Sequence, residues 1–179
     1  MTYEITYASR TGNTAVLAEK IKNLARMKLE KEPVSVRKLE EDGSQAAGAG
    51  MSDWIFAGFW VDRGDCSGEM IRFLEGLRGR TVFLFGTIGS GNPVYQEKVM
   101  NRVRSHLDGS NRVAGTFLCQ GKMLPQVRQK FEAMLQEDPE NENAKMRLAN
   151  FERAMTHPDD EDLAALTETV KKAFSEFLT

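Results

Sequence analysis

The chain is poor in the side chains that build metal sites and disulfides, with two cysteines and two histidines among 179 residues. Cys66 and Cys119 lie far apart and lack metal-ligand spacing, which argues against a disulfide framework and a zinc site. His106 and His157 each stand without a spaced partner. We therefore expect both histidines to be ordinary surface or helix-end residues, and we expect no metal.

Long apolar runs and strong net charge are also missing. No run approaches the roughly 20 apolar residues that span a bilayer, so we expect no membrane segment. The net charge of −2 offers no field that would attract nucleic acid. Residues 1–8 alternate like a strand and do not form a charged and then apolar leader, so we expect a cytoplasmic protein. The length fits a single domain over residues 1–179.

Strand-like and helix-like patterns alternate over most of the chain. Helical spacing of apolar residues predicts helices near residues 14–30, 70–79 and 99–107, while Gly43–Gly50 favours a loop or a short frayed helix. Such alternation implies an α/β fold with a mainly parallel sheet that helices cover on both faces. The predicted strands cover residues 2–7, 34–39, 53–58, 81–85 and 112–119.

Three unusual loops follow the first, third and fourth predicted strands: Ser9–Thr14, Phe59–Cys66 and Gly86–Tyr95. Because the carboxyl ends of parallel strands meet at one edge of a sheet, we expect these loops to converge there. Hydroxyls and a glycine fill the first loop at the start of a helix, where N–H groups and the helix dipole favour an anion. This loop therefore predicts a phosphate site. A loop that only caps the helix, through Thr11 or Thr14, is the alternative.

The last third of the chain is helical in pattern. Apolar stripes predict helices over residues 124–134, 144–155 and 159–177. A five-stranded doubly wound domain needs only one of these helices to complete it. We therefore interpret residues 122–157 as a helical insertion after the fifth strand.

The motif Ser9-Arg10-Thr11-Gly12-Asn13-Thr14 resembles the phosphate loop of the flavodoxin family, and the two later loops lie where flavodoxins hold the flavin ring. The resemblance extends to about Cys119 and includes the final helix. It implies a flavodoxin-like five-stranded parallel sheet with strand order 2-1-3-4-5. Gly58–Gly64 and Gly115–Lys122 further resemble a flavodoxin-like subgroup of anaerobic bacteria, in which some members are linked to bilirubin reduction as accessory proteins.

The resemblance implies that the chain binds FMN. Hydroxyls for the FMN phosphate would come from Ser9, Thr11 and Thr14. Backbone N–H groups would come from Arg10, Gly12 and Asn13, and the Arg10 side chain could add positive charge. Gly64 would allow a peptide to reorient beside the flavin. The other residues expected around the flavin are Phe59, Trp60, Val61, Asp62, Thr87, Ile88, Gly89, Gly91, Asn92 and Tyr95.

Two aromatic residues of these loops have more than one interpretation. Trp60 offers a large flat surface for stacking, although the residue that stacks in the family usually lies slightly further on, at Asp62 in this chain. Trp60 could stack on the flavin ring, contact another part of the ligand or pack in the core. Tyr95 either covers the outer face of the ring or belongs to the following helix.

Three functions are compatible with this sequence. We expect an FMN protein that transfers electrons to a redox partner protein. The first alternative is a flavoenzyme of the same fold that reduces a quinone or acts on a tetrapyrrole, with the insertion as a wall or lid. The second is an accessory binding module with weakly held or absent flavin, in which the insertion docks a partner. The oligomeric state stays open.

Overall fold

The computed structural model describes residues 1–41 and 50–177, so the prediction for residues 43–49 lies outside the described residues. The strands are β1 (Tyr3–Tyr7), β2 (Ser35–Lys38), β3 (Trp54–Asp62), β4 (Asp65–Cys66), β5 (Thr81–Ile88) and β6 (Arg112–Gln120). The helices are α1 (Asn13–Leu29), α2 (Gly68–Gly76), α3 (Pro93–Arg104), α4 (Pro125–Glu137), α5 (Glu142–Ala154) and α6 (Asp160–Phe177).

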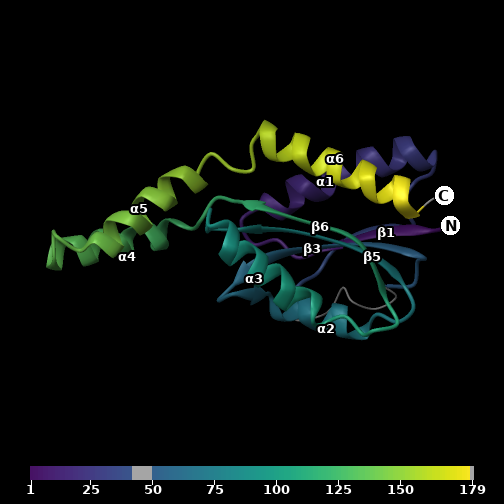
Figure 1. Ribbon diagram of the computed structural model, residues 1–179, viewed down its shortest axis with the longest axis horizontal. Coiled ribbons are helices and arrows are strands. Elements are labelled where there is room, and N and C mark those ends of the chain that lie inside the picture. The colour runs from purple at the N-terminus through teal and green to yellow at the C-terminus, as the bar shows by residue number, and fades with distance from the viewer. Residues whose placement is uncertain (42–49, 178–179) are drawn as a thin grey trace.

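A parallel sheet in the order β2-β1-β3-β5-β6 forms the centre of the molecule, and β4 pairs antiparallel with β3 as a short extra strand. Helices α1 and α6 cover one face of this sheet, and α2 and α3 cover the other (Figure 1). The predicted fold class and strand order are therefore confirmed.

Alternating side chains of the central strands build one core on each face of the sheet, because successive residues of a strand point to opposite faces. Trp54 and Phe56 of β3 pack with Phe174 of α6, and the rings of Trp54 and Phe174 are 5.3 Å apart. Ile55 and Phe59 of the same strand belong to the other core, beneath α2 and α3. None of the helices in the described part of the chain is long and apolar enough to cross a bilayer.

Strands β3 and β5 run further than the sequence patterns predict. The predicted loop Phe59–Cys66 is the end of β3, a turn and β4, and the start of the predicted loop Gly86–Tyr95 is the end of β5. Both predictions of a loop at these positions are wrong. Only residues 89–92 connect β5 to α3.

Two glycines that look like turn signals are in fact required by packing between these strands. In the parallel register Gly58 lies opposite Phe85, and Phe59 lies opposite Gly86. A Cβ on Gly86 would lie 2.6 Å from the ring of Phe59, and a Cβ on Gly58 would overlap the ring of Phe85. Each glycine therefore leaves room for the phenylalanine of the neighbouring strand. We call this arrangement the Gly–Phe interlock.

A tight hairpin joins β3 to β4. Arg63 and Gly64 both have left-handed backbone, with φ of 48° and 86°, as the two central residues of a type I′ turn require. Asp62 and Asp65 lie opposite each other on either side of this turn. Type I′ turns favour Asn-Gly, Asp-Gly and Gly-Gly, so Gly64 is the half of this signal that the sequence contained.

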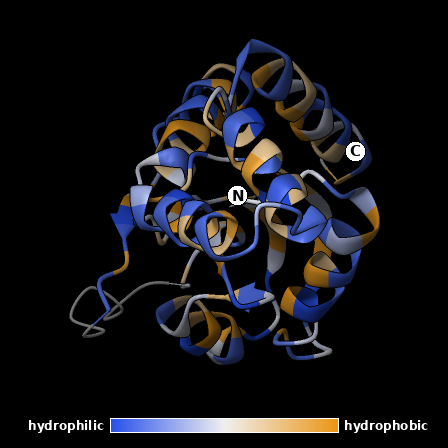
Figure 2. Ribbon diagram, turned by 90° about the vertical axis from the view of Figure 1, so that its left-hand side faces the viewer, coloured by the Kyte–Doolittle hydropathy of each residue, from blue (hydrophilic) through white to orange (hydrophobic). Residues whose placement is uncertain are grey.

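Residues 122–157, which we call the arm, contain α4 and α5. The two helices pack on each other and extend beyond the carboxyl edge of the sheet, away from the two chain termini (Figure 1). The N–H of Lys122 donates to the carbonyl of His157 at 3.2 Å, so the two ends of the arm lie side by side. Figure 2 looks onto this end of the molecule, and its helices show both hydrophilic and hydrophobic stripes.

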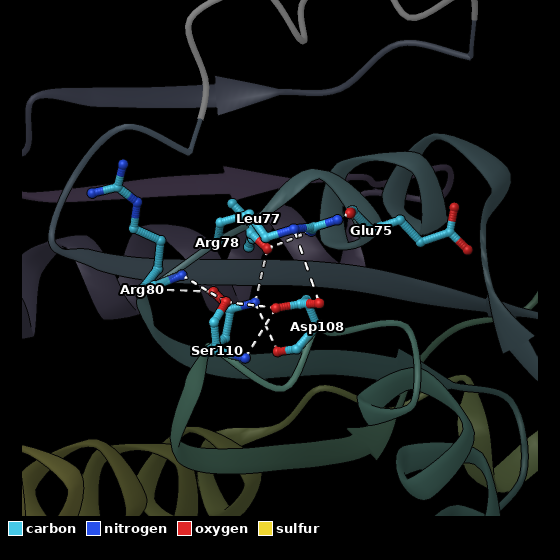
Figure 3. Close-up of polar contacts among 8 residues, drawn as sticks. Glu75, Leu77, Arg78, Arg80, Asp108 and Ser110 are labelled. Atoms are coloured by element: carbon cyan, nitrogen blue, oxygen red, sulfur yellow. Dashed lines mark hydrogen bonds and ion pairs between the residues drawn. The ribbon is translucent and has the colours of Figure 1, made fainter.

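The opposite edge of the sheet is fastened by polar contacts (Figure 3). The side chain of Asn111 donates to the carbonyl of Leu77 at 2.9 Å and accepts from the N–H of Arg80 at 3.0 Å. Asp108 accepts from the hydroxyl of Ser110 at 2.6 Å. These bonds hold the start of β5 against the turn before β6. At this edge of the sheet, the connecting segments therefore contact each other.

The interlock predicts an effect on stability. We expect Gly58→Ala to lower the free energy of unfolding by about 1–3 kcal/mol, because the added methyl group overpacks a filled core. Gly76→Ala is the matched control, since a Cβ there meets nothing within 4 Å. It should leave stability unchanged or raise it by up to about 1 kcal/mol. Urea unfolding of both variants measures the difference, and equal stability would contradict the packing role of Gly58.

Candidate functional site

The loop Ser9–Thr14 joins β1 to the N-terminus of α1. Gly12 is the N-cap, in left-handed conformation with φ of 87°, and makes no side-chain cap. The hydroxyl oxygen of Ser9 is buried and has no hydrogen-bond partner among the described residues. An unsatisfied buried hydroxyl is costly, so it indicates a missing partner. Together with the helix N-terminus, this hydroxyl fits an anionic group such as a phosphate.

Neither threonine of the loop caps the helix through a described hydrogen bond. Thr11 accepts a hydrogen bond from the Asn13 side chain at 2.7 Å. The buried hydroxyl of Thr14 donates to the carbonyl of Phe59 and lies 3.1 Å from the hydroxyl of Thr87. Thr14 thus joins the loop to the ends of β3 and β5, and its expected contact with phosphate stays a prediction.

Trp60 lies at the end of β3, opposite Thr87 of β5. Its side chain is half-buried, and the guanidinium of Arg10 lies 5.4 Å from the centre of its ring. This cation–π contact holds the positive charge of Arg10 beside the loop. Trp60 is partly buried and packs against the core beneath α2 and α3, whereas Phe59 is fully buried and offers only its backbone to the site.

A mainly apolar pocket of about 260 Å³ lies between the carboxyl edge of the sheet and the arm. Arg10 and Thr11 line one end of it, and Trp60, Val61, Thr87, Ile88 and Gly89 form the strand side. The remaining wall comes from the arm and the residue before it: Gly121, Lys122, Met123, Leu124 and Val127. The pocket thus combines a cationic end with an apolar body.

Arg10 and Trp60 also line a second hollow of about 480 Å³. Ser9 faces this hollow, and Glu40, Glu41 and Glu69 line it. Three carboxylates disfavour an anion in its interior. The Arg10–Trp60 pair therefore separates an acidic hollow from the apolar pocket.

The remaining predicted site residues do not line the apolar pocket, and Tyr95 lies beside the β3–β4 turn. Tyr95 belongs to the first turn of α3, as one of its two interpretations predicts, and a Cβ on Gly64 would lie 3.3 Å from its hydroxyl. Asn92 caps α3 by accepting from the N–H of Tyr95 at 3.1 Å. Asp62 is exposed beside Arg63. Roles for these residues toward a flavin stay predictions.

A model of the flavodoxin domain matches residues 4–171. The chain belongs to the flavodoxin family. It is 33% identical over 175 residues to the flavodoxin-like domain-containing protein BilS of Clostridium symbiosum, covering 92% of each chain. It is 31% identical over 160 residues to BilS of Clostridioides difficile, covering 89% of this chain and 88% of the relative.

A solved flavodoxin has the same fold. Oxidised Flavodoxin 2 of Bacillus cereus matches with a TM-score of 0.58 and 17% identity, over 99% of this chain and 100% of that chain. The family membership and the BilS relatives confirm the resemblance seen in the sequence. Membership of the flavodoxin family supports FMN as the cofactor.

Both histidines lie just after the end of a helix, as the helix-end interpretation predicts, and both have carboxylate partners that spacing along the sequence did not indicate. Nε2 of His106 lies 3.0 Å from the carboxylate of Asp65, which also accepts from Arg102 at 3.0 Å. Nδ1 of His157 lies 2.6 Å from Asp162. The Asp65 and His106 partners are 41 residues apart, which is why spacing along the sequence did not reveal them.

Asp65 fastens the β3–β4 hairpin to α3. Burial alone would raise the pKa of its carboxyl, but hydrogen bonds from His106, the Cys66 N–H and Arg102 together hold the pKa below its usual value. The ligand atoms of Asp65, Cys66 and His106 lie within 4.8 Å of one another. Arg102 already places a positive charge on this carboxylate, so the cluster is best described as an ion-pair network.

Cys66 and Cys119 are both buried free thiols. Burial raises the pKa of the Cys66 thiol, and the negative charge of Asp65 raises it further. Burial also raises the pKa of Cys119, with Asp162 adding to the effect. Both side chains therefore stay in the thiol form at neutral pH.

The sequence allows the arm to form a wall or lid of the site but does not identify the residues that do so. Met123, Leu124 and Val127 form a wall of the pocket. Gln120 and Asn150 hydrogen-bond the connection after β5. The apolar stripe of α4 predicts a helix and does not say which residues contact the sheet edge. No sequence spacing relates Asn150 to a segment about 60 residues earlier.

The Asp65 network predicts a pH-dependent contribution to stability. We expect Asp65→Asn to lower the free energy of unfolding at pH 7 by about 1–3 kcal/mol, because charge-assisted hydrogen bonds are lost. The pKa of Asp65 is lowered in the folded state, so its contribution exists above the usual carboxyl pKa and disappears as the pH falls through the folded value. The difference from the unmodified protein should shrink below about pH 4.

Urea unfolding between pH 7 and pH 3 measures this effect. Asp62→Asn is the control, because it removes a carboxylate from the same hairpin whose only described ion pair is an exposed one with Arg63. It should change stability by no more than about 0.5 kcal/mol. A difference for Asp65→Asn that stays constant with pH would contradict the role of its carboxylate.

Proposed function

We propose that this flavodoxin-family chain binds FMN at the carboxyl edge of its sheet and transfers electrons to a redox partner protein. The observation that carries the proposal is the buried, unpartnered hydroxyl of Ser9 in a loop at a helix N-terminus. Ser9 lines the acidic hollow, and the next two residues of its loop, Arg10 and Thr11, line the apolar pocket of about 260 Å³. An anion site next to an apolar pocket matches the two chemically different parts of FMN.

The phosphate end of the proposed site consists of Ser9, Arg10 and the first turn of α1. The Ser9 hydroxyl and the backbone N–H groups after Gly12 would donate hydrogen bonds to phosphate oxygens. Arg10 would add a positive charge, held in place by its contact with Trp60. A dianionic phosphate would gain from both.

The ring end consists of Trp60, Ile88 and the arm residues that line the pocket. FMN supplies one- and two-electron redox chemistry when bound, while the protein sets its orientation and surroundings. Apolar side chains here would exclude water from the ring, and Trp60 offers a flat surface for contact. The positions of Trp60 and Thr87 are fixed by the pairing of β3 with β5.

A second function is favoured by one observation. Met123, Leu124 and Val127 of the arm add an apolar wall to the pocket, as a site for a small planar substrate would require. This supports the alternative of a flavoenzyme that reduces a quinone or acts on a tetrapyrrole. A third candidate, an accessory module with little or no flavin, differs from both in its affinity for FMN.

The proposed phosphate site predicts a selective loss of affinity. The purified protein should be yellow and should release FMN on denaturation. We expect Arg10→Ala to weaken FMN binding about tenfold, which corresponds to the loss of one charge-assisted contact. Binding of riboflavin, which lacks the phosphate, should change less than about twofold. Quenching of flavin fluorescence during titration of the apoprotein measures both affinities.

Arg63→Ala is the control for charge, because Arg63 is an exposed arginine of the hairpin, with 92% of its side chain accessible. It should leave both affinities unchanged. A colourless protein that does not bind added FMN would refute the two flavin-dependent functions and favour the accessory module. Equal losses of FMN and riboflavin in Arg10→Ala would refute the placement of the phosphate at this loop.

Turnover separates the carrier from the enzyme. For a carrier, we expect the reduced protein to pass electrons rapidly to a partner protein and only slowly to small quinones or tetrapyrroles. Stopped-flow absorbance of the flavin measures these rates. Saturable multiple turnover of a small acceptor, with a KM that rises when Leu124→Ala alters the arm wall, would establish the enzyme instead.

A further inference from the structure

Asn150 of α5 makes two hydrogen bonds to the connection after β5. Its Nδ2 donates to the carbonyl of Gly89 at 2.8 Å, and its Oδ1 accepts from the N–H of Gly91 at 3.1 Å. One carboxamide therefore satisfies a backbone acceptor and a backbone donor of the same short segment, as a paired peptide group would. This contact joins the arm to a segment that lines the apolar pocket.

Gln120, the last residue of β6, sets the orientation of the Asn150 amide. Its Nε2 donates to the carbonyl of Gly89 at 3.1 Å and to Oδ1 of Asn150 at 3.2 Å. Oδ1 of Asn150 thus accepts from two N–H groups, while its own Nδ2 faces a carbonyl. A Cβ on Gly91 would lie 2.8 Å from the Gln120 side chain, so the segment and both amides are closely packed.

The arm is also attached to the phosphate loop. The Asn13 side chain donates to the carbonyl of Lys122 at 2.9 Å and to the hydroxyl of Thr11 at 2.7 Å. Met123 packs against the connection after β5, because a Cβ on Gly89 would lie 2.5 Å from its sulfur. The root of the arm therefore contacts two of the segments that form the proposed FMN site.

Beyond its root, the arm extends away from the sheet, and its helices α4 and α5 pack on each other (Figure 1). Its orientation relative to the sheet consequently depends on these contacts at its root. Any change in residues 89–91 would be transmitted to α5 through Asn150, and the reverse also holds. FMN binding at residues 89–91 and the ordering of α5 are then coupled, and each stabilises the other by the same free energy.

We propose that Asn150 is a positioning residue that fixes residues 89–91 for the flavin and couples FMN binding to the order of the arm. The proposal rests on the proposed FMN function. It makes the arm part of the flavin site, whereas an insertion that only docks a partner would be independent of flavin. This coupling implies that a protein that binds the arm also alters the affinity for FMN.

Titration of the apoprotein with FMN and with riboflavin tests the positioning role. We expect Asn150→Ala to weaken both flavins about tenfold, because the segment that it fixes faces the ring and not the phosphate. Asn143→Ala is the matched control. Asn143 lies on the same helix, is exposed, and accepts only from Arg147 among the described hydrogen bonds. The Asn143→Ala variant should bind FMN and riboflavin with the affinities of the unmodified protein.

Amide hydrogen exchange tests the coupling, which a purely structural role would not produce. FMN should slow exchange in α5 about tenfold in the unmodified protein and in Asn143→Ala. In Asn150→Ala, saturating FMN should protect Ser9–Thr14 and leave α5 unprotected. If Asn150→Ala does not fold, Asn150→Asp serves in its place, since it keeps the size of the side chain, replaces the donor to Gly89 by a carboxylate oxygen and adds a negative charge.

The outcomes separate this proposal from the proposed function. Failure of the unmodified protein to bind FMN would overturn both. Normal FMN binding by the unmodified protein and equal binding by the Asn150 variants would overturn the positioning role alone. Exchange in α5 that does not respond to FMN in the unmodified protein would overturn the coupling.

Discussion

The Gly–Phe interlock between β3 and β5 is the constraint on which the site depends. Gly58 leaves room for Phe85, and Gly86 leaves room for Phe59. The interlock lets β3 and β5 stay paired beyond the core, as far as Trp60 and Thr87. Side chains at a strand end are held more rigidly than those of a loop. The pocket therefore has a wall formed by strand ends where the sequence patterns predicted loops.

Much of the fold was predictable because its signals are local. Apolar strands alternating with helical stripes predict a doubly wound sheet, and the motif Ser9–Thr14 predicts which edge carries the site. The predicted loops were wrong where glycine has two structural roles, in turns and in close packing. Gly58 and Gly86 resemble turn signals but are needed for ring packing, and this depends on a neighbouring strand. His106 and Asn150 could not be assigned, because their partners lie 41 and about 60 residues away.

The apolar pocket has two walls of different origin. One comes from strand ends that belong to the flavodoxin sheet, and the other comes from the arm. The arm lies at the same edge as the phosphate loop, so its side chains face the region where the proposed flavin would exchange electrons. An electron carrier and an enzyme could share this architecture. They would differ only in whether a partner protein or a small substrate approaches the flavin ring beside Met123 and Leu124.

The burial of both cysteines has a consequence for a protein in this role. Reduced flavins react with oxygen and release peroxide, and peroxide attacks thiolates far faster than thiols. Cys66 and Cys119 are 3% and 5% exposed, and their pKa values are raised. Neither side chain offers a thiolate to an oxidant formed at its own flavin. Burial thus protects both sulfur atoms from oxidants formed at a bound flavin, and repeated air exposure should leave both thiols intact.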